Sequence, residues 1–130
     1  MATATSLAQT VAPASEPVSV AECRDHLEIG SGVTDHDAKF AIWIEAARRQ
    51  YEHDTGLALI SQTWTLQADA WPDDLLQIPL RPVASVSSVT YYDENDTQQT
   101  LATTVYGFDS ARRAIYLKVD QSCPLIFGQL

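Results

Sequence analysis

The sequence changes its hydrophobic period abruptly at Gly56, and this change limits the folds that the chain can adopt. Before Gly56, apolar residues recur at helical spacing. They form one stripe of Phe40, Ile44, Ala47 and Tyr51. After Gly56, residues 60–68 read ISQTWTLQA and alternate between apolar and polar, which is typical of a half-buried strand. Because a glycine suits the left-handed residue that follows many helices, we predict a long helix over residues 35–55 that ends at Gly56.

The predicted long helix is apolar over more of its circumference than one stripe requires. Ala38, Ile42 and Ala46 lie outside the main stripe and recur every four residues, so they share a second face. A helix that is apolar on two sides usually packs on two sides. We therefore predict that these three residues face a neighbouring subunit or partner while the main stripe packs on the domain's own sheet.

A shorter helix precedes the long one. Ser19 and Glu22 have the spacing of a capping box, in which each side chain accepts a hydrogen bond from a backbone N–H at the helix start. Residues 1–16 are rich in Ala, Thr, Ser and Pro and offer little apolar surface to bury. We therefore divide the chain into an extended arm over residues 1–16, a domain over residues 17–118 and a tail over residues 119–130.

The region after Gly56 contains several short strand patterns separated by turn residues. DENDT at residues 93–97 and the segment around residues 109–112 have turn composition and predict two hairpins. Pro79 suits an edge strand because it cannot donate to a sheet. The pattern predicts an α+β fold with two N-terminal helices, one short and one long, followed by an antiparallel sheet of about five or six strands.

Composition excludes several classes of function. The chain has 130 residues and a formal net charge of −9, with eight Lys and Arg against 17 Asp and Glu, which disfavours a nucleic-acid-binding face. It has no apolar run near the roughly 20 residues that a membrane span needs. Cys23 and Cys123 stand apart from any metal-binding pattern, so we expect free buried thiols and synthesis in the cytoplasm. No motif for a cofactor is present.

Two polar clusters are candidate sites of chemistry. His53 and Asp54 could act as a base and its orienting carboxylate, as in a small hydrolase, but adjacent helical residues point about 100° apart. Asp35 and Asp37 flank His36 at a helix start, where capping and the helix dipole explain both acids. We therefore predict no catalytic residue and no metal site, and interpret residues 53–56 as a helix end.

The remaining candidates are basic and aromatic. The paired arginines, Arg48 with Arg49 and Arg112 with Arg113, could line a DNA channel, but in an acidic chain we favour salt links to neighbouring acids. Trp71 lies in a turn between strands and is a candidate interface residue, because aromatic residues are enriched at interface centres. The tail contains further apolar candidates for a partner interface, namely Leu125, Ile126 and Phe127.

An ordered set of segments carries a resemblance to a known family. The set is PVSVAECRDHL at residues 17–27, TGLALISQTWTL at residues 55–66 and IPLRPVASVSSVTYYD at residues 78–93, followed by QQTL and VYGFD. Over about residues 17–117, the chain resembles the small head–tail connector, or adaptor, proteins of long-tailed phages and gene transfer particles. Relatives commonly continue beyond the last hairpin into a further strand and helices.

The resemblance implies a structural virion protein without enzymatic activity or cofactor. Members form a homo-oligomeric ring of commonly about twelve copies under the portal protein. The ring extends the channel through which DNA passes without specific binding, and it docks the next neck or tail-completion protein. The implied location is the head–tail neck of a virion, after synthesis in the cytoplasm of a bacterial host. The alternatives are a monomeric peptide- or protein-binding module and, less favoured, a small hydrolase that uses His53.

Overall fold

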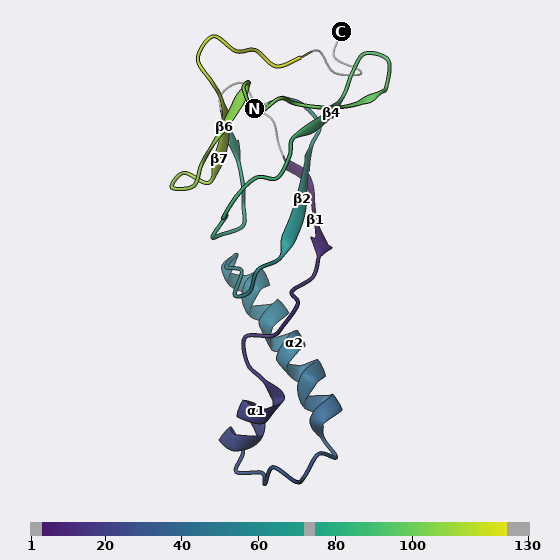
Figure 1. The fold of residues 1–130 in the computed structure, drawn as a ribbon, viewed down its shortest axis with the longest axis vertical. Helices are drawn as coiled ribbons and strands as arrows, with labels where there is room; N and C mark the ends of the chain where they lie inside the picture. Colours follow the sequence, from purple (N-terminus) through teal and green to yellow (C-terminus); the bar gives the residue numbers. More distant parts are fainter. Residues whose placement is uncertain (1–3, 72–74, 125–130) are drawn as a thin grey trace. The chain divides into compact units, whose positions relative to one another are not determined.

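The computed structural model describes residues 4–71 and 75–124, and the chain divides into two compact units (Figure 1). Residues 9–64 form one unit, here called the helical unit. The strand unit consists of the described residues up to Ala8 and from Thr65 onward. Each unit has its own packing and is described separately. Neither helix of the described residues combines the length and apolar character that a membrane span requires.

Helix α1, Val20–His26, begins at the predicted capping box. The Ser19 hydroxyl accepts a hydrogen bond from the Glu22 backbone N–H at 3.2 Å, and the Glu22 carboxylate accepts one from the Ser19 backbone N–H at 2.8 Å. These reciprocal bonds satisfy two backbone donors that a helix start otherwise leaves without a partner. The bond from the Ser19 backbone is the main reason that the pKa of Glu22 lies below its usual range. The prediction of a short capped helix is confirmed.

Helix α2, Asp37–Thr55, is the predicted long helix. It ends at Gly56, whose φ of 66° is left-handed and whose N–H donates to the Glu52 carbonyl at 2.9 Å. Only glycine adopts this conformation without a steric penalty, so the predicted stop is confirmed. The start differs from the expectation, because His36 occupies the N-cap position without a side-chain hydrogen bond.

The face of α2 that packs inside the helical unit is only partly the predicted stripe. Phe40 and Arg48 are buried and Ile44 is half-buried, whereas Ala47 and Tyr51 are exposed. Helix α1 packs on this buried side, where Arg24 of α1 donates a hydrogen bond to Asp37 of α2 at 3.1 Å. The inner face of α2 therefore includes a charged residue at its centre, and most of the helix circumference remains exposed.

A strand precedes both helices. β1, Ala4–Val11, pairs with β2, Thr63–Ala68, in a two-stranded sheet. Polar side chains support the pairing: the Ser6 hydroxyl donates to Gln67 at 2.7 Å, and the Thr10 hydroxyl donates to the Thr63 carbonyl at 3.2 Å. Strand pairing of this kind uses backbone and polar side-chain groups and needs little apolar burial. A polar segment that could not form a core is therefore still able to form a strand.

The other strands form two further small sheets. β3, Leu75–Gln77, and β6, Tyr106–Asp109, flank β7, Ala114–Leu117, in the order β3-β7-β6 with antiparallel pairing throughout. β4, Thr90–Tyr92, pairs with β5, Gln98–Thr100. The described residues thus contain seven strands in three sheets.

The predicted fold class is wrong in two respects. The helices are not both N-terminal elements, because β1 comes before them, and the strands do not join in one sheet of about five or six. Pro79 and Pro82 supply the physical reason for the second difference. Each lacks the backbone N–H that a sheet requires, and residues 82–89 form no strand although their composition favours one.

Both predicted hairpin turns are confirmed. Between β4 and β5, the Asp93 carboxylate accepts hydrogen bonds from the backbone N–H groups of Asn95 and Thr97 at 2.9 and 3.1 Å. Between β6 and β7, the Asp109 carboxylate accepts from the N–H groups of Ala111 and Arg112 at 2.9 and 3.1 Å. Such local bonds are the reason that Asp is favoured in turns.

The β6–β7 pair generates a stability prediction. Gly107 lies directly opposite Tyr116, and a Cβ atom at Gly107 would lie 2.5 Å from Cζ of the tyrosine ring. We expect Gly107→Ala to lower the free energy of unfolding by about 1–3 kcal/mol, because the ring must leave its position. Urea denaturation measures this loss. In a Tyr116→Ala background the same substitution should cost far less, and equal losses in both backgrounds would contradict the account.

Candidate functional site

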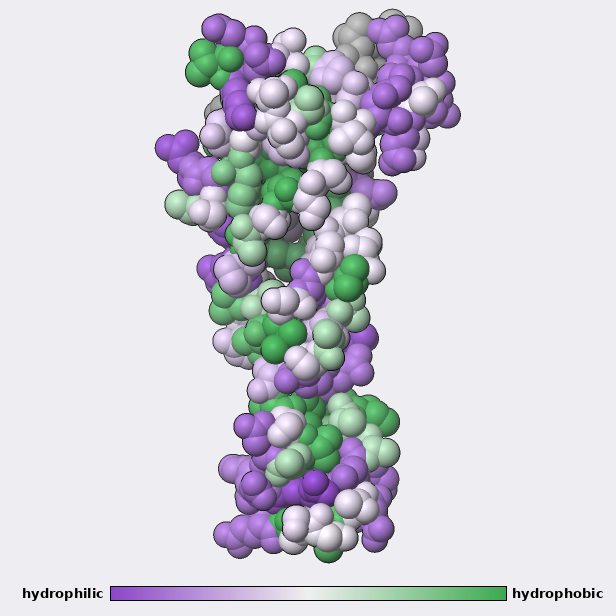
Figure 2. Space-filling view, in the orientation of Figure 1, coloured by the Kyte–Doolittle hydropathy of each residue, from purple (hydrophilic) through white to green (hydrophobic). Residues whose placement is uncertain are grey.

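The outer face of α2 is exposed where the sequence predicted an interface. Ala38, Ile42 and Ala46 all lie on the solvent side of the helix, and Ile42 retains 65% of its accessible surface. Trp43, whose ring is tilted at 57° to that of Phe40 with the centroids 5.9 Å apart, is also largely exposed. Apolar surface appears on the helical unit beside charged groups in Figure 2. Exposed apolar groups gathered on one helix are typical of an interaction site, so these residues stay candidates for an interface.

The inner face of α2 is organised by a buried arginine that the sequence did not distinguish from its neighbour. Arg48 is only 5% exposed, and its guanidinium donates to the two oxygens of Glu16 at 2.7 and 3.2 Å. Its Nη1 atom donates to Glu52, one turn along the helix, at 2.8 Å. The bond to Glu16 is the main reason that the pKa of Arg48 is raised, although burial acts in the opposite direction.

Glu52 extends this network towards the strands. Its second oxygen accepts hydrogen bonds from the Leu59 backbone N–H at 2.9 Å and from the Gln62 amide at 2.8 Å. The Gln62 carbonyl oxygen in turn accepts from the Trp64 indole N–H at 3.0 Å and from the Gln9 amide. All of these residues belong to the helical unit. The network therefore joins its segments through polar groups that satisfy one another.

The predicted salt links of the arginines are confirmed for three of them. Arg48 pairs with Glu16 and Glu52. On the surface of α2, Arg49 pairs with Glu45 at 2.7 Å, and at the β6–β7 turn Arg112 lies 3.6 Å from Asp109.

His53 and Asp54 lie at the exposed end of α2. Their side chains are 85% and 58% exposed, and Nδ1 of the histidine is 3.2 Å from the Asp54 carboxylate. Hydrogen bonds from Gln50 first, and then from His53, lower the pKa of Asp54. A hydrolytic site needs an enclosed pocket with a nucleophile or a metal beside such a pair. This geometry is that of a solvated helix end, which is the interpretation that the sequence favoured.

Metal-binding clusters are absent from residues 4–71 and 75–124, and this stretch includes Asp35, His36 and Asp37. Asp37 is used in the salt bridge to Arg24. Both cysteines are free and half-buried, and burial raises the pKa of the Cys123 thiol. A half-buried thiol of raised pKa is a poor nucleophile and metal ligand.

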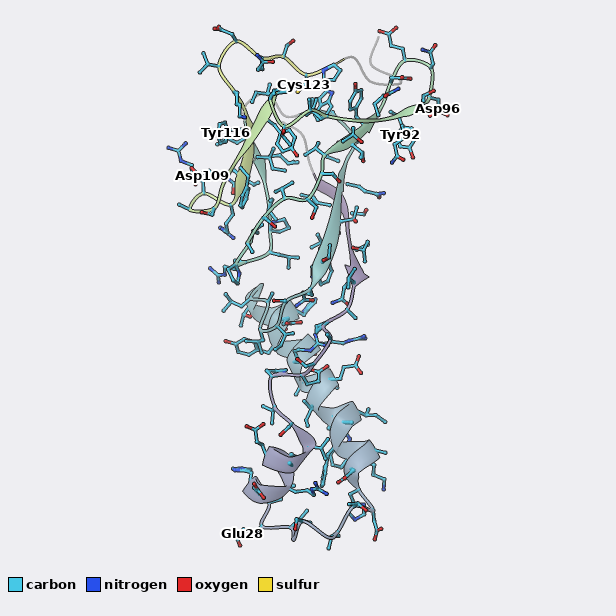
Figure 3. The ribbon with its side chains drawn as sticks, viewed as in Figure 1. Glu28, Tyr92, Asp96, Asp109, Tyr116 and Cys123 are labelled. Carbon is cyan, nitrogen blue, oxygen red and sulfur yellow. The ribbon has the colours of Figure 1, made fainter. Side chains whose placement is uncertain are left out.

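Trp71 lies in the strand unit and has contacts that sequence reasoning missed. Its indole N–H donates to the Pro124 carbonyl at 2.8 Å, and its ring centroid is 5.8 Å from that of Tyr91. It also lines a small apolar cavity together with Tyr116 and Cys123, both labelled in Figure 3. Trp71 therefore packs partly on its own unit, and its contact with a partner stays a prediction. Leu125, Ile126 and Phe127 lie outside the described residues.

Comparison with known proteins finds no matching family profile and no curated protein with a matching sequence. Chains of solved structures share the fold, and two of them come from gene transfer agent particles. A chain of the neck of an empty gene transfer agent particle, computed with C6 symmetry, is 30% identical, with a TM-score of 0.77 over 94% of this chain. A chain of the virion of a native gene transfer agent particle is 27% identical, with a TM-score of 0.76 over 93% of this chain. This chain spans 65% and 64% of the lengths of these neighbours.

These similarities confirm the resemblance that the sequence indicated. The chain is similar in both fold and sequence to chains of gene transfer agent particles, and one of these chains comes from the neck. This finding agrees with the expected location in the neck of a virion.

The buried ion pair of Arg48 generates a prediction with a built-in control. Arg48→Ala should lower the free energy of unfolding by about 3 kcal/mol, because it leaves Glu16 and Glu52 without a cation in a partly buried site. Arg49→Ala removes an exposed pair on the same helix and should cost less than about 1 kcal/mol. Chemical denaturation of both variants tests the difference, and equal losses would show that the network does not hold the unit together.

The geometry of the helix end predicts the behaviour of a double variant. His53→Ala combined with Asp54→Ala should leave particle assembly and infectivity close to normal, because both side chains are exposed and bond to each other and to Gln50 on the surface of the helix. Particle yield and infectivity are the measurements. A loss of function in a double variant that remains folded would revive the hydrolase hypothesis.

Proposed function

We propose that this chain, which has the fold of a gene transfer agent neck chain, is a structural neck protein that acts as an adaptor below the portal. In this role it extends the channel for DNA and docks the next neck or tail-completion protein. The observation that carries the proposal is the structural match to the neck chain over 94% of the present sequence. The portal and the next neck protein are the partners that the family resemblance implies.

A ring of identical copies fits this role. The neck neighbour belongs to an assembly computed with C6 symmetry, and a ring of about twelve copies is compatible with a sixfold axis. The outer face of α2 offers apolar surface at Ala38, Ile42 and Ala46 for contacts between copies or with a partner. The exposure of Ile42 and Trp43 supports an interface there, because a chain that worked alone would gain nothing from leaving both in water.

The charge distribution supports passage of DNA without specific binding. The formal net charge is −9, and Arg48, Arg49 and Arg112 are each paired with an acid of the same chain. Each Lys or Arg that holds a phosphate adds affinity and salt dependence. A channel through which DNA must slide works better without such fixed contacts, so paired arginines suit it.

The contacts with other neck proteins complete the proposal. Trp71 and the apolar residues Leu125, Ile126 and Phe127 are the proposed contacts with the portal or the next neck protein. The role requires no catalysis, cofactor or metal. The neighbours are parts of particles, which supports a structural rather than an enzymatic function.

Light scattering on the full chain tests the proposal directly. The chain is measured alone over a range of concentrations and then together with the portal protein of its particle. We expect a closed ring in at least one of these conditions. A chain that stays monomeric in all of them would support the alternative of a monomeric binding module and contradict the adaptor role.

The outer face of α2 generates a mutational prediction. Ile42→Asp should block ring formation while the monomer stays within about 1 kcal/mol of wild-type stability, because the side chain is exposed in the monomer. A carboxylate buried without a partner at the contact would cost several kcal/mol. Ala47→Asp, which adds the same charge at an exposed position of α2 away from the outer face, is the matched control and should assemble normally.

Light scattering and denaturation together decide the outcome. If Ile42→Asp unfolds the monomer, the outer face belongs to the chain's own core. If the variant assembles like the wild type, that face is not a contact in the ring.

A further inference from the structure

The helical unit has two outer faces that point away from each other. Helix α1 packs on the inner side of α2, where Arg24 meets Asp37. The outward residues of α1, including Ala21, Glu22 and Asp25, therefore face away from α2. The outward residues of α2 face away from α1 for the same reason. A unit with two opposite exposed faces can contact one neighbour on each side.

The two faces differ in charge. The outer face of α2 carries the apolar strip of Ala38, Ile42 and Ala46, and it is flanked by the exposed cations Lys39 and Arg49, the second of which pairs with Glu45. The outer face of α1 carries exposed acids at Glu22 and Asp25, and Glu28 follows at the tip of the unit (Figure 3). Exposed apolar side chains stand at both ends of α1, namely Val18 and Leu27.

The positions of Lys39 and Arg49 indicate which face of this acidic unit a second copy can contact. Residues 9–64 contain four Lys and Arg against nine Asp and Glu, so the net charge of the helical unit is 4 − 9 = −5. Arg24 and Arg48 are both held in ion pairs on the inner side of the helices. Lys39 lies on the outer face of α2 beside the apolar strip, and Arg49 on the same face forms an exposed pair with Glu45 at 2.7 Å. Copies of such a unit repel one another unless a contact brings cations opposite acids.

We infer that the outer face of α2 in one copy packs against the outer face of α1 in the next copy. This inference rests on the proposed ring and names the two surfaces that would form it. Ile42 would meet the apolar groups at the ends of α1, while Lys39 and Arg49 would lie opposite Asp25 and Glu28. A contact between two different faces is heterologous, and its repetition gives a ring when the rotation between copies closes.

The alternative contact, α2 against α2, is disfavoured by the same charges. An isologous pair places each surface against its own copy, so Lys39 and Arg49 would approach the same cations of the partner. Like charges placed opposite each other suppress the wrong pairing. The head-to-tail contact avoids this repulsion and uses both faces of every copy.

A charge exchange between two variants of the full chain tests the inference. One variant is Lys39→Glu with Arg49→Glu, and the other is Asp25→Lys with Glu28→Lys. Circular dichroism and thermal melting first confirm that each remains folded. Each variant alone should need at least about tenfold higher concentration than the wild type to assemble, because acids face acids or cations face cations.

An equimolar mixture of the two variants is the decisive sample. Each contact in an alternating ring joins either the two exchanged faces or the two wild-type faces, so assembly should return with both chains in equal amounts. Light scattering and native mass spectrometry give the size and the composition. If only the α2 variant is impaired, or if the mixture does not assemble while the wild type does, the inference is wrong and the adaptor role stands. A wild-type chain that never assembles, even beside the portal protein, refutes both.

Discussion

The ion pairs of Arg48 are the interaction on which the helical unit depends. The Arg48 guanidinium lies in the middle of the inner face of α2 and binds Glu16, which precedes α1, and Glu52. Glu52 in turn accepts hydrogen bonds from Leu59 and Gln62. A buried pair of this kind contributes little net stability compared with an apolar core, but losing one partner is costly. We interpret the network as a device that fixes the positions of the segments around one helix, with little apolar core to help.

This mode of construction explains why the outer side of α2 is available for assembly. The inner face uses Phe40, Ile44 and Arg48, and most of the rest of the circumference is exposed. A helix held by polar groups on one side can keep apolar residues such as Ile42 for a different purpose on the other. Exposed apolar surface on a small chain favours aggregation of a monomer, but it stabilises an assembly in which another subunit covers it. The similarity to a neck chain of a gene transfer agent particle supports the second use.

Local signals made much of the fold predictable. The Ser19–Glu22 capping box, the Gly56 stop and the turns at Asp93 and Asp109 each depend on hydrogen bonds between residues close in sequence. Strand β1 was missed because its partner β2 lies more than 50 residues away and burial is not what joins them. The division into three sheets was missed because the strand-favouring composition of residues 82–89 outweighed Pro79 and Pro82, which lack the N–H that a sheet requires.

The candidate site was predictable to a similar extent. The breadth of the apolar pattern identified Ala38, Ile42 and Ala46, and the structure exposes all three. The sequence could not separate Arg48 from Arg49, because only the fold brings Glu16 beside the first of them.

A reconstruction of the neck of the chain's own particle tests the central claim most directly. We predict a closed ring of this chain next to the portal, with the outer face of α2 covered by another subunit. A neck that lacks the chain, or a ring in which that face is open to solvent, would contradict the account.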